Sequence, residues 1–206
     1  MKKIMFNDRF ELTQAVLEGR KTMTRRLVPQ KVINNSKVYA QLGQRGGNIN
    51  DARIEYIVHQ SPYKIGEVVA IAQCYYNVYG YETCISERGE KDAGIFNKMF
   101  VRAESMPHHI KITNIRVEHL QDISDEDCLK EGIYIDKEGG QSIGYPLAVP
   151  FYCTFRGAIN RDGKQLYWST PKDAFATLID KVSGKGTWES NPYVWVYEFE
   201  LVDEMV

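Results

Sequence analysis

Residues 170–202 constrain the fold most, because they combine a well-marked helix with a well-marked strand. Thr170, Pro171 and Asp173 form a typical helix start, with a capping hydroxyl, a proline at the first helical position and an acid at the third. Apolar side chains then recur at helical spacing until Gly184: Phe175, Leu178, Ile179 and Val182. Residues 193–202 alternate as a strand does, with one face made of Tyr193, Trp195, Tyr197, Phe199 and Leu201.

Weaker patterns predict the other elements. Asn7 or Asp8 is expected to cap a helix over residues 9–18, with Phe6 as a hydrophobic staple and Gly19 as its stop. Strands are expected at residues 53–59, 67–73 and 109–120, the last with a bulge near Asn114. A short helix is expected to begin after Ser124 and to end at Gly132. Residues 29–53, 86–98 and 133–166 are predicted to be loops or connections.

Strands separated by short helices and long loops favour an α+β fold, with a small β-barrel, flanking helices and long insertions. The length of 206 residues and the 43% of hydrophobic residues suit one domain, residues 1–206, with a core of its own. The insertions lie near residues 29–53, 75–105 and 134–168. The sequence leaves the oligomeric state open.

The net charge, the cysteines and the lack of long apolar runs limit the binding mode and the compartment of the protein. The net charge of −1 means that any binding of a nucleic acid depends on a local basic patch. The four cysteines form no C-x-x-C pair and are interpreted as free thiols of a reducing compartment. No apolar run reaches the length of a membrane span and no signal-peptide pattern follows Met1, so we expect a cytoplasmic protein without a membrane partner.

The basic segment 19–26 is the first candidate site. It comprises Gly19, Arg20, Lys21, Thr22, Met23, Thr24, Arg25 and Arg26. Four cations and two hydroxyls that follow a helix stop suit a phosphate, a carboxylate or the polar edge of a base. The alternative is a solvated basic loop without a role.

Glu131 is the second candidate, because it lies in the last turn of the short helix. A carboxylate at this negative end of the helix dipole is unfavourable by roughly 0.3–1 kcal/mol, which hints at a cationic partner. The alternative is an exposed glutamate screened by water. The aromatic residues of segment 188–195 could stack a base, but core packing is favoured. The four histidines are given no role.

The order Gly-Arg-Lys-Thr-x-Thr-Arg-Arg after an N-terminal helix resembles the signature of the ASCH domain, a PUA-like β-barrel superfamily. Segments 61–68, 115–132 and 188–199 resemble the larger, phage- and prophage-type members. The three insertions have no counterpart in the compact members. The resemblance implies a barrel with a cleft that binds RNA, a nucleotide or a modified nucleoside.

Some compact ASCH proteins are amidohydrolases that remove the acetyl group from N4-acetylcytidine, without a metal or cofactor. By motif position, the resemblance implies catalytic roles for Lys21, Thr24 and Glu131. The remaining residues of the motif would bind the substrate: Gly19, Arg20, Thr22, Arg25 and Arg26. The match of Glu131 rests on the Glu-Gly helix end.

The chemistry places conditions on these three residues. Lys21 and Thr24 cannot share a face of a regular strand, so we expect them to converge on a turn or a helix end. Thr24 could be the nucleophile and a neutral Lys21 its base, if the pKa of the lysine falls by about three units, roughly 4 kcal/mol. A nearby arginine and some desolvation could supply this. Glu131 beside Lys21 would oppose it, so Glu131 is expected to hold Thr24, a water or the substrate amine.

Three hypotheses therefore stand: a nucleoside-directed amidohydrolase, a module that binds RNA or a nucleotide without turnover, and a phage-borne protein whose basic loop contacts an acidic partner. All three require the loop to be exposed in a cleft with Glu131 nearby.

Overall fold

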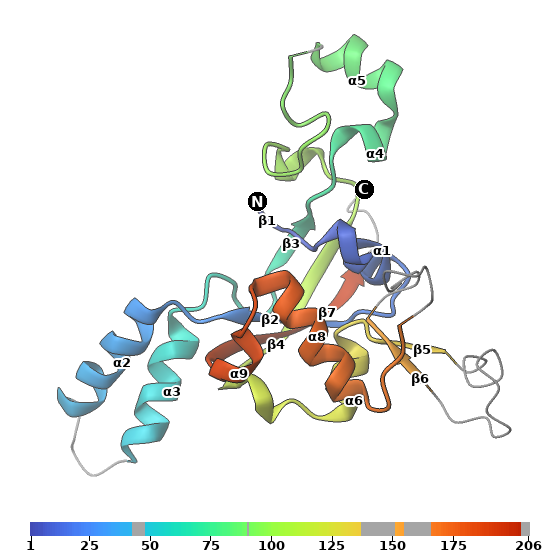
Figure 1. The fold of residues 1–206 in the computed structure, drawn as a ribbon. Coiled ribbons are helices and arrows are strands. Elements are labelled where there is room, and N and C mark those ends of the chain that lie inside the picture. Colours follow the sequence, from blue (N-terminus) through green and yellow to red (C-terminus); the bar gives the residue numbers. More distant parts are fainter. Residues whose placement is uncertain (43–47, 90, 137–150, 155–165, 203–206) are drawn as a thin grey trace, which may run out of the picture.

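A five-stranded mixed sheet forms the centre of the molecule (Figure 1). The computed structural model describes residues 1–42, 48–89, 91–136, 151–154 and 166–202. The strand order is β1 (Lys2–Ile4), β3 (Val68–Ile71), β4 (His109–His119), β7 (Tyr193–Val202) and β2 (Met23–Leu27). The β1–β3 pair is parallel and the other pairs are antiparallel.

The sheet does not close into the small β-barrel that the sequence predicted. Strands β1 and β2 lie at opposite edges, and within the described residues they do not pair with each other. The edge strand β1 has only three residues, so it offers little backbone for closure. The α+β class is confirmed, and the architecture is an open sheet with helices around it.

The strongest sequence patterns produced the predicted elements. Helix α8 (Pro171–Ser183) begins where the Thr170 hydroxyl accepts from the Asp173 N–H at 3.1 Å. Helix α6 (Asp125–Lys130) begins likewise at Ser124, whose hydroxyl accepts from the Asp127 N–H at 3.1 Å. Strand β4 shows the predicted bulge, with a register shift between Ile112 and Asn114. These elements follow from signals within a few residues of their own ends.

The N-terminal helix is shorter than predicted. It divides into a 3-10 turn, η1 (Asp8–Phe10), and helix α1 (Leu12–Leu17), because Glu11 between them has a positive φ of 53°. Asn7 caps η1, accepting from the Arg9 N–H at 3.0 Å. Gly19 ends the segment with φ 71°, as the stop signal predicted.

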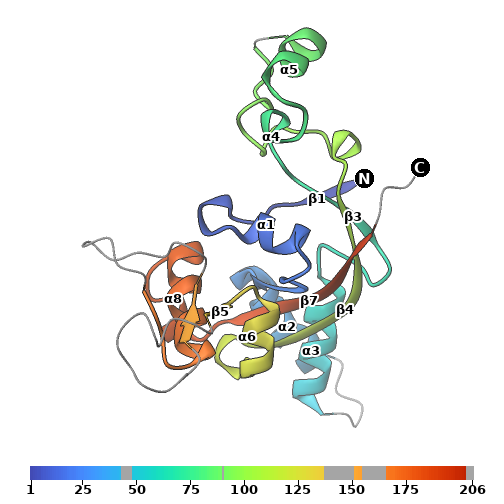
Figure 2. The ribbon, with the colours of Figure 1, turned by 90° about the vertical axis from the view of Figure 1, so that its right-hand side faces the viewer.

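The predicted loop at 29–53 and the predicted strand at 53–59 are both wrong. Within the described residues these positions form helices α2 (Gln30–Leu42) and α3 (Ile49–His59), which lie side by side (Figures 1 and 2). The small side chains of Ser36 and Ala40 are buried in α2. Helix α3 is fastened to the sheet where the Trp195 indole N–H donates to the Ile57 carbonyl at 2.8 Å. Packing between distant segments overrode the polar local pattern.

The 75–105 insertion forms a lobe that projects from the sheet (Figure 1). It contains α4 (Tyr75–Tyr79), α5 (Tyr81–Arg88) and η2 (Ala103–Ser105), so the predicted connection at 86–98 begins inside a helix. The lobe and the adjoining end of β3 share a second apolar cluster: Ala70, Ala72, Tyr75, Cys84, Ile95, Val101, Ala103 and Met106. The 134–168 insertion contributes β5 (Tyr134–Asp136) and β6 (Phe151–Cys153), an antiparallel pair. Its residues 137–150 and 155–165 lie outside the described part.

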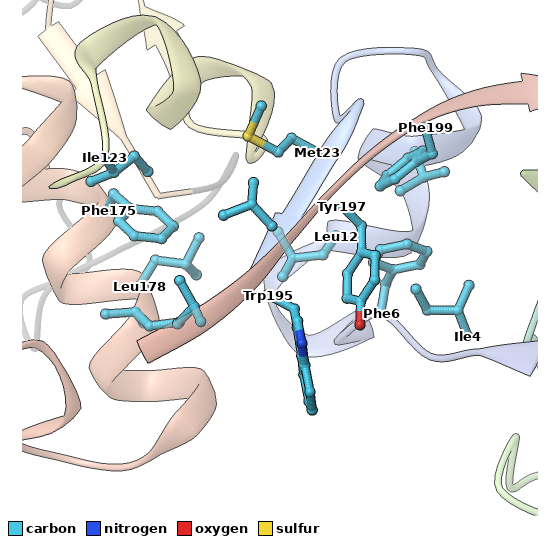
Figure 3. Close-up of a cluster of buried hydrophobic side chains, with 14 of the residues drawn as sticks. Ile4, Phe6, Leu12, Met23, Ile123, Phe175, Leu178, Trp195, Tyr197 and Phe199 are labelled. Atoms are coloured by element: carbon cyan, nitrogen blue, oxygen red, sulfur yellow. The ribbon is translucent and has the colours of Figure 1, made fainter. Parts of the chain in front are cut away.

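The main core lies where β7 passes between α8 and the N-terminal segment. Figure 3 shows Trp195 and Tyr197 of β7 between Phe175 and Leu178 of α8 on one side and the N-terminal residues Ile4 and Phe6 on the other, while Phe199 lies beside Phe6. Two short elements, η3 (Leu120–Asp122) and α9 (Thr187–Ser190), complete this end of the sheet. No helix in the described ranges is long and apolar enough to cross a membrane.

Candidate functional site

A pocket of about 610 Å³ lies at the free edge of β2. Among the strands of the described residues, β2 pairs only with β7, so side chains from both of its faces reach this edge. The other walls come from residues 5–9, from Lys98 of the projecting lobe and from the apolar face of α8. The pocket is lined by Met5, Phe6, Asn7, Asp8, Arg9, Leu12, Lys21, Thr24, Arg25, Arg26, Leu27, Lys98, Glu131, Phe175, Leu178, Ile179, Val182 and Ser183.

Lys21 is buried in this pocket with only 2% of its surface exposed. The turn at Gly19 returns the chain, and the Lys21 N–H donates to the Ala15 carbonyl at 2.9 Å. Its amine donates to Glu131 twice, to the carboxylate Oε2 at 2.6 Å and to the backbone carbonyl at 2.8 Å. Carbonyls at a helix C-terminus lack partners within the helix, so a buried ammonium there satisfies one of them.

Arg25 binds the other oxygen of the same carboxylate. Its Nη1 lies 3.1 Å from Glu131 Oε1, and its Nη2 lies 2.6 Å from Glu118 Oε1 and 3.1 Å from Asp127 Oδ2. Arg116 extends the network, because it pairs with Glu118, with Asp127 and with Glu198. The Arg25 side chain is 1% exposed, so its charge is held by carboxylates in place of water.

The pKa values of the two buried cations move in opposite directions. Burial lowers the pKa of Lys21, and the attraction of Glu131 offsets this only in part. Burial alone would also lower the pKa of Arg25, but the carboxylates of Glu131 and Glu118 outweigh it, so that this pKa is raised. The site therefore contains one permanently charged arginine beside an amine that gives up its proton more readily than usual.

Thr24 and Arg26 lie on one face of β2, two residues apart, and both line the pocket. Thr24 is 5% exposed. Residues three apart on a regular strand point to opposite faces, but this does not separate Lys21 from Thr24. Lys21 precedes the strand and approaches the pocket from a turn. The three residues to which the resemblance assigned catalysis thus meet in one pocket.

Two expectations about this segment are wrong. Residues 23–27 form an edge strand in place of an exposed basic loop. Residues 23–25 are buried, and Lys21 and Arg25 border the pocket from inside the protein. Glu131 contacts Lys21 directly, although it was expected to hold Thr24, a water or a substrate. The reason is that α6 ends against the turn before β2, where the Thr22 N–H donates to the Lys130 carbonyl at 2.9 Å.

The other predicted binding residues lie outside the pocket. Gly19 forms the turn. The Thr22 N–H donates to the Lys130 carbonyl, and the Thr22 carbonyl accepts from the Phe199 N–H. The Arg20 Nε pairs with Glu18 Oε2 at 2.6 Å, beside a separate hollow between α1 and the start of the lobe. Only Arg25 and Arg26 of the predicted binding set line the pocket.

Sequence reasoning missed several pocket and network residues. Arg116 and Glu118 lie two apart on β4, so a charged pair on one face of a predicted strand was a usable signal. Asp127 stands three residues after the cap Ser124, where an acid is typical of a helix start, so its presence gave no signal of a site. Lys98, whose amine lies 2.8 Å from Asp8 Oδ2, carried no signal, because only the tertiary structure brings the lobe to residues 5–9.

The remaining candidates serve packing. Trp195 is buried, and the Trp188 ring lies edge-on to Phe175, with 6.1 Å between centroids. His119 stacks on Tyr193 at 3.9 Å and its Nδ1 lies 2.9 Å from the Asn191 carbonyl. Cys74, Cys84 and Cys128 are free thiols. In the described part of the chain, no group of three or more His, Cys, Asp or Glu residues is arranged to hold a metal ion.

Comparison of the chain with protein-family models, with curated proteins and with solved structures gave no significant match in any of the three. The functional argument therefore rests on the residues and the geometry of the pocket.

Proposed function

We propose that this chain is a divergent PUA-like protein of the ASCH type that works in the cytoplasm and binds a cytidine-type nucleoside or nucleotide, free or in RNA. We further propose that it hydrolyses an N-acyl group of that ligand. The observation that carries the proposal is the meeting of Lys21, Thr24 and Glu131 in one pocket, with 2.6 Å between the Lys21 amine and the Glu131 carboxylate. The resemblance to the ASCH motif had assigned these residues before their positions in space were known, and two of them are 110 positions apart.

The proposed reaction begins at the Thr24 hydroxyl. Burial lowers the pKa of Lys21, and in its neutral form the Lys21 amine can accept a proton. Thr24 Oγ loses its proton to Lys21 and forms a bond to the acyl carbon. The bond from that carbon to the exocyclic nitrogen then breaks, and Lys21 returns the proton to the leaving amine. Water cleaves the Thr24 ester, which releases the carboxylic acid and restores the hydroxyl.

Arg25 supports this scheme as a positioning residue. It holds one oxygen of Glu131 at 3.1 Å and leaves the other for Lys21 at 2.6 Å. Because Glu118 and Asp127 hold Arg25 in turn, the carboxylate has a fixed orientation before any ligand enters. Such preorganisation is what proton transfer in a buried site requires.

A binding module without turnover is the second candidate, and the same pair favours it. A 2.6 Å contact between the amine and the carboxylate stabilises the ammonium form of Lys21, which is no base. Lys21 would then act as a fixed charge or hydrogen-bond donor toward a ligand. The two functions differ in whether the amine loses its proton within the working pH range.

The test is release of cytidine from N4-acetylcytidine, followed by chromatography. Turnover should fall by at least about 10²-fold in Lys21→Ala and in Thr24→Ala, and Thr24→Ser should recover part of it. Lys111→Gln, an exposed change on β4, is the matched control and should leave turnover unchanged. Turnover that survives Thr24→Ala would eliminate the nucleophile. No turnover together with saturable cytidine binding would establish the binding module.

A further inference from the structure

Arg26 lines the pocket without a carboxylate partner. Its Nη2 donates to the Met5 carbonyl at 2.5 Å, and its guanidinium carbon lies 5.8 Å from the centre of the Phe6 ring. Within the described residues, no carboxylate lies within ion-pair distance of it. A guanidinium carries five N–H donors, so most of the donors of Arg26 remain for a ligand.

The other cations of the pocket are differently placed. Lys21 and Arg25 are held by Glu131, and Lys98 pairs with Asp8 at 2.8 Å. Arg9, exposed at the rim, resembles Arg26 in having no ion pair among the described residues, and its guanidinium carbon lies 5.7 Å from the centre of the Phe10 ring. The uncompensated positive charge of the pocket therefore lies at Arg26 and Arg9.

The lining as a whole is cationic in a chain that is nearly neutral. Five cationic side chains line the pocket, namely Arg9, Lys21, Arg25, Arg26 and Lys98, against the two carboxylates of Asp8 and Glu131. This excess of three positive charges contrasts with the net charge of −1 for the whole chain. A hollow with concentrated charge of one sign attracts a ligand of the opposite sign.

We propose that Arg26, assisted by Arg9, binds a phosphate group of the ligand, so that the pocket takes a phosphorylated cytidine in preference to the free nucleoside. This inference rests on the part of the proposed function that gives the pocket a cytidine-type ligand, and it does not require hydrolysis. Guanidinium groups bind phosphate through paired, charge-assisted hydrogen bonds.

The position of Arg26 suits such a ligand. Thr24 and Arg26 project from the same face of β2, with about 6.6 Å between their positions along the strand. The long arginine side chain adds further reach. In a cytidine nucleotide the phosphate and the amine of the base are at opposite ends. A ligand with its acyl group at Thr24 would thus carry its phosphate toward Arg26.

A phosphate of this kind can belong to a mononucleotide or to a strand. Calorimetric titration of the full chain at low salt with cytidine, cytidine 5′-monophosphate and the dinucleotide cytidylyl-cytidine separates these sources. We expect the monophosphate to bind at least about tenfold more tightly than cytidine, with a preference that falls as salt rises. Tighter binding of the dinucleotide than of the monophosphate would assign the phosphate to a strand.

Arg26→Gln should remove the preference for phosphate, so that cytidine and its monophosphate bind with affinities within about twofold of each other. Arg26→Lys should retain part of the preference. Arg102→Gln, an exposed change on the lobe outside the pocket lining, should retain all of it. Thermal unfolding of each variant shows whether it is folded.

Equal binding of cytidine and its monophosphate would overturn the inference, and so would an unchanged preference in folded Arg26→Gln, or no binding of any of the three probes. The titrations use ligands without an acyl group. A phosphate preference in a protein that hydrolyses nothing would therefore refute the hydrolase and leave this site standing. Hydrolysis of the acyl group without a preference for phosphate would support the hydrolase and overturn the phosphate site.

Discussion

The amine of Lys21 lies 2.6 Å from a carboxylate oxygen of Glu131, a residue 110 positions later in the chain. Both side chains are almost fully buried, at 2% and 5% exposure. The contact joins the turn before β2 to the last turn of α6, so it is at once a structural clamp and the centre of the candidate site. The predictions below test both aspects.

Glu131→Gln should be strongly destabilising, because it leaves the buried charges of Lys21 and Arg25 without their shared carboxylate. The expected loss in the free energy of unfolding is about 3–5 kcal/mol, measured by urea denaturation at pH 7. Glu126→Gln, on the same helix but 77% exposed and paired with the exposed Lys130, should change the free energy of unfolding by less than about 0.5 kcal/mol. Equal effects of the two changes would show that the buried pair has no special importance.

The pH dependence of stability should reveal the lowered pKa of Lys21. The pKa of Lys21 is lower in the folded protein than its ordinary value of 10.5. At pH values between these two pKa values, the unfolded state therefore binds more protons than the folded state. In that window stability rises with pH, by about 1.4 kcal/mol for each unit of lowering. The free energy of unfolding of the wild type minus that of Lys21→Met should therefore increase from pH 7 toward pH 10.5. A difference that stays flat or decreases would mean that Glu131 holds the amine charged.

Arg25→Lys should destabilise the protein although it keeps the charge. A lysine cannot donate in a fixed planar fork to Glu118, Asp127 and Glu131 together, so at least one buried carboxylate loses its partner. We expect a loss of about 2–4 kcal/mol in thermal or urea unfolding. Arg20→Lys is the matched control, since its pair with Glu18 is partly exposed, and it should be nearly neutral. A stable Arg25→Lys protein would argue against the charge network as a fixed support.

The cysteine side chains should differ in reactivity. Burial raises the pKa of Cys128 to about 12, so at pH 8 its thiolate is about one part in ten thousand. Cys84 and Cys153 are also buried, whereas Cys74 is partly exposed. Iodoacetamide at pH 8 should modify Cys74 first, as read by mass spectrometry of the peptides, and all four thiols in urea. Rapid labelling of Cys128 in the native protein would contradict its complete burial.

Local sequence signals predicted the elements whose causes are local. Thr170 and Ser124 cap their helices with their own hydroxyls, and the bulge beside Asn114 follows from a change of phase within one strand. The resemblance to the ASCH motif also pointed to Lys21, Thr24 and Glu131, since a motif is recognised from residue types without coordinates. All three indeed line one pocket.

Only the tertiary structure decided the rest. Helices α2 and α3 form from a polar sequence because Ser36 and Ala40 are buried in their packing and Trp195 holds Ile57 from the sheet. The open sheet, the burial of Lys21 and Arg25, and the direct contact of Glu131 with Lys21 depend on where distant segments meet. A sequence specifies its caps, turns and periodicities within a few residues. The partner of a buried charge is set by the packing of the whole chain, because desolvation and pairing energies exist only once both groups have left water.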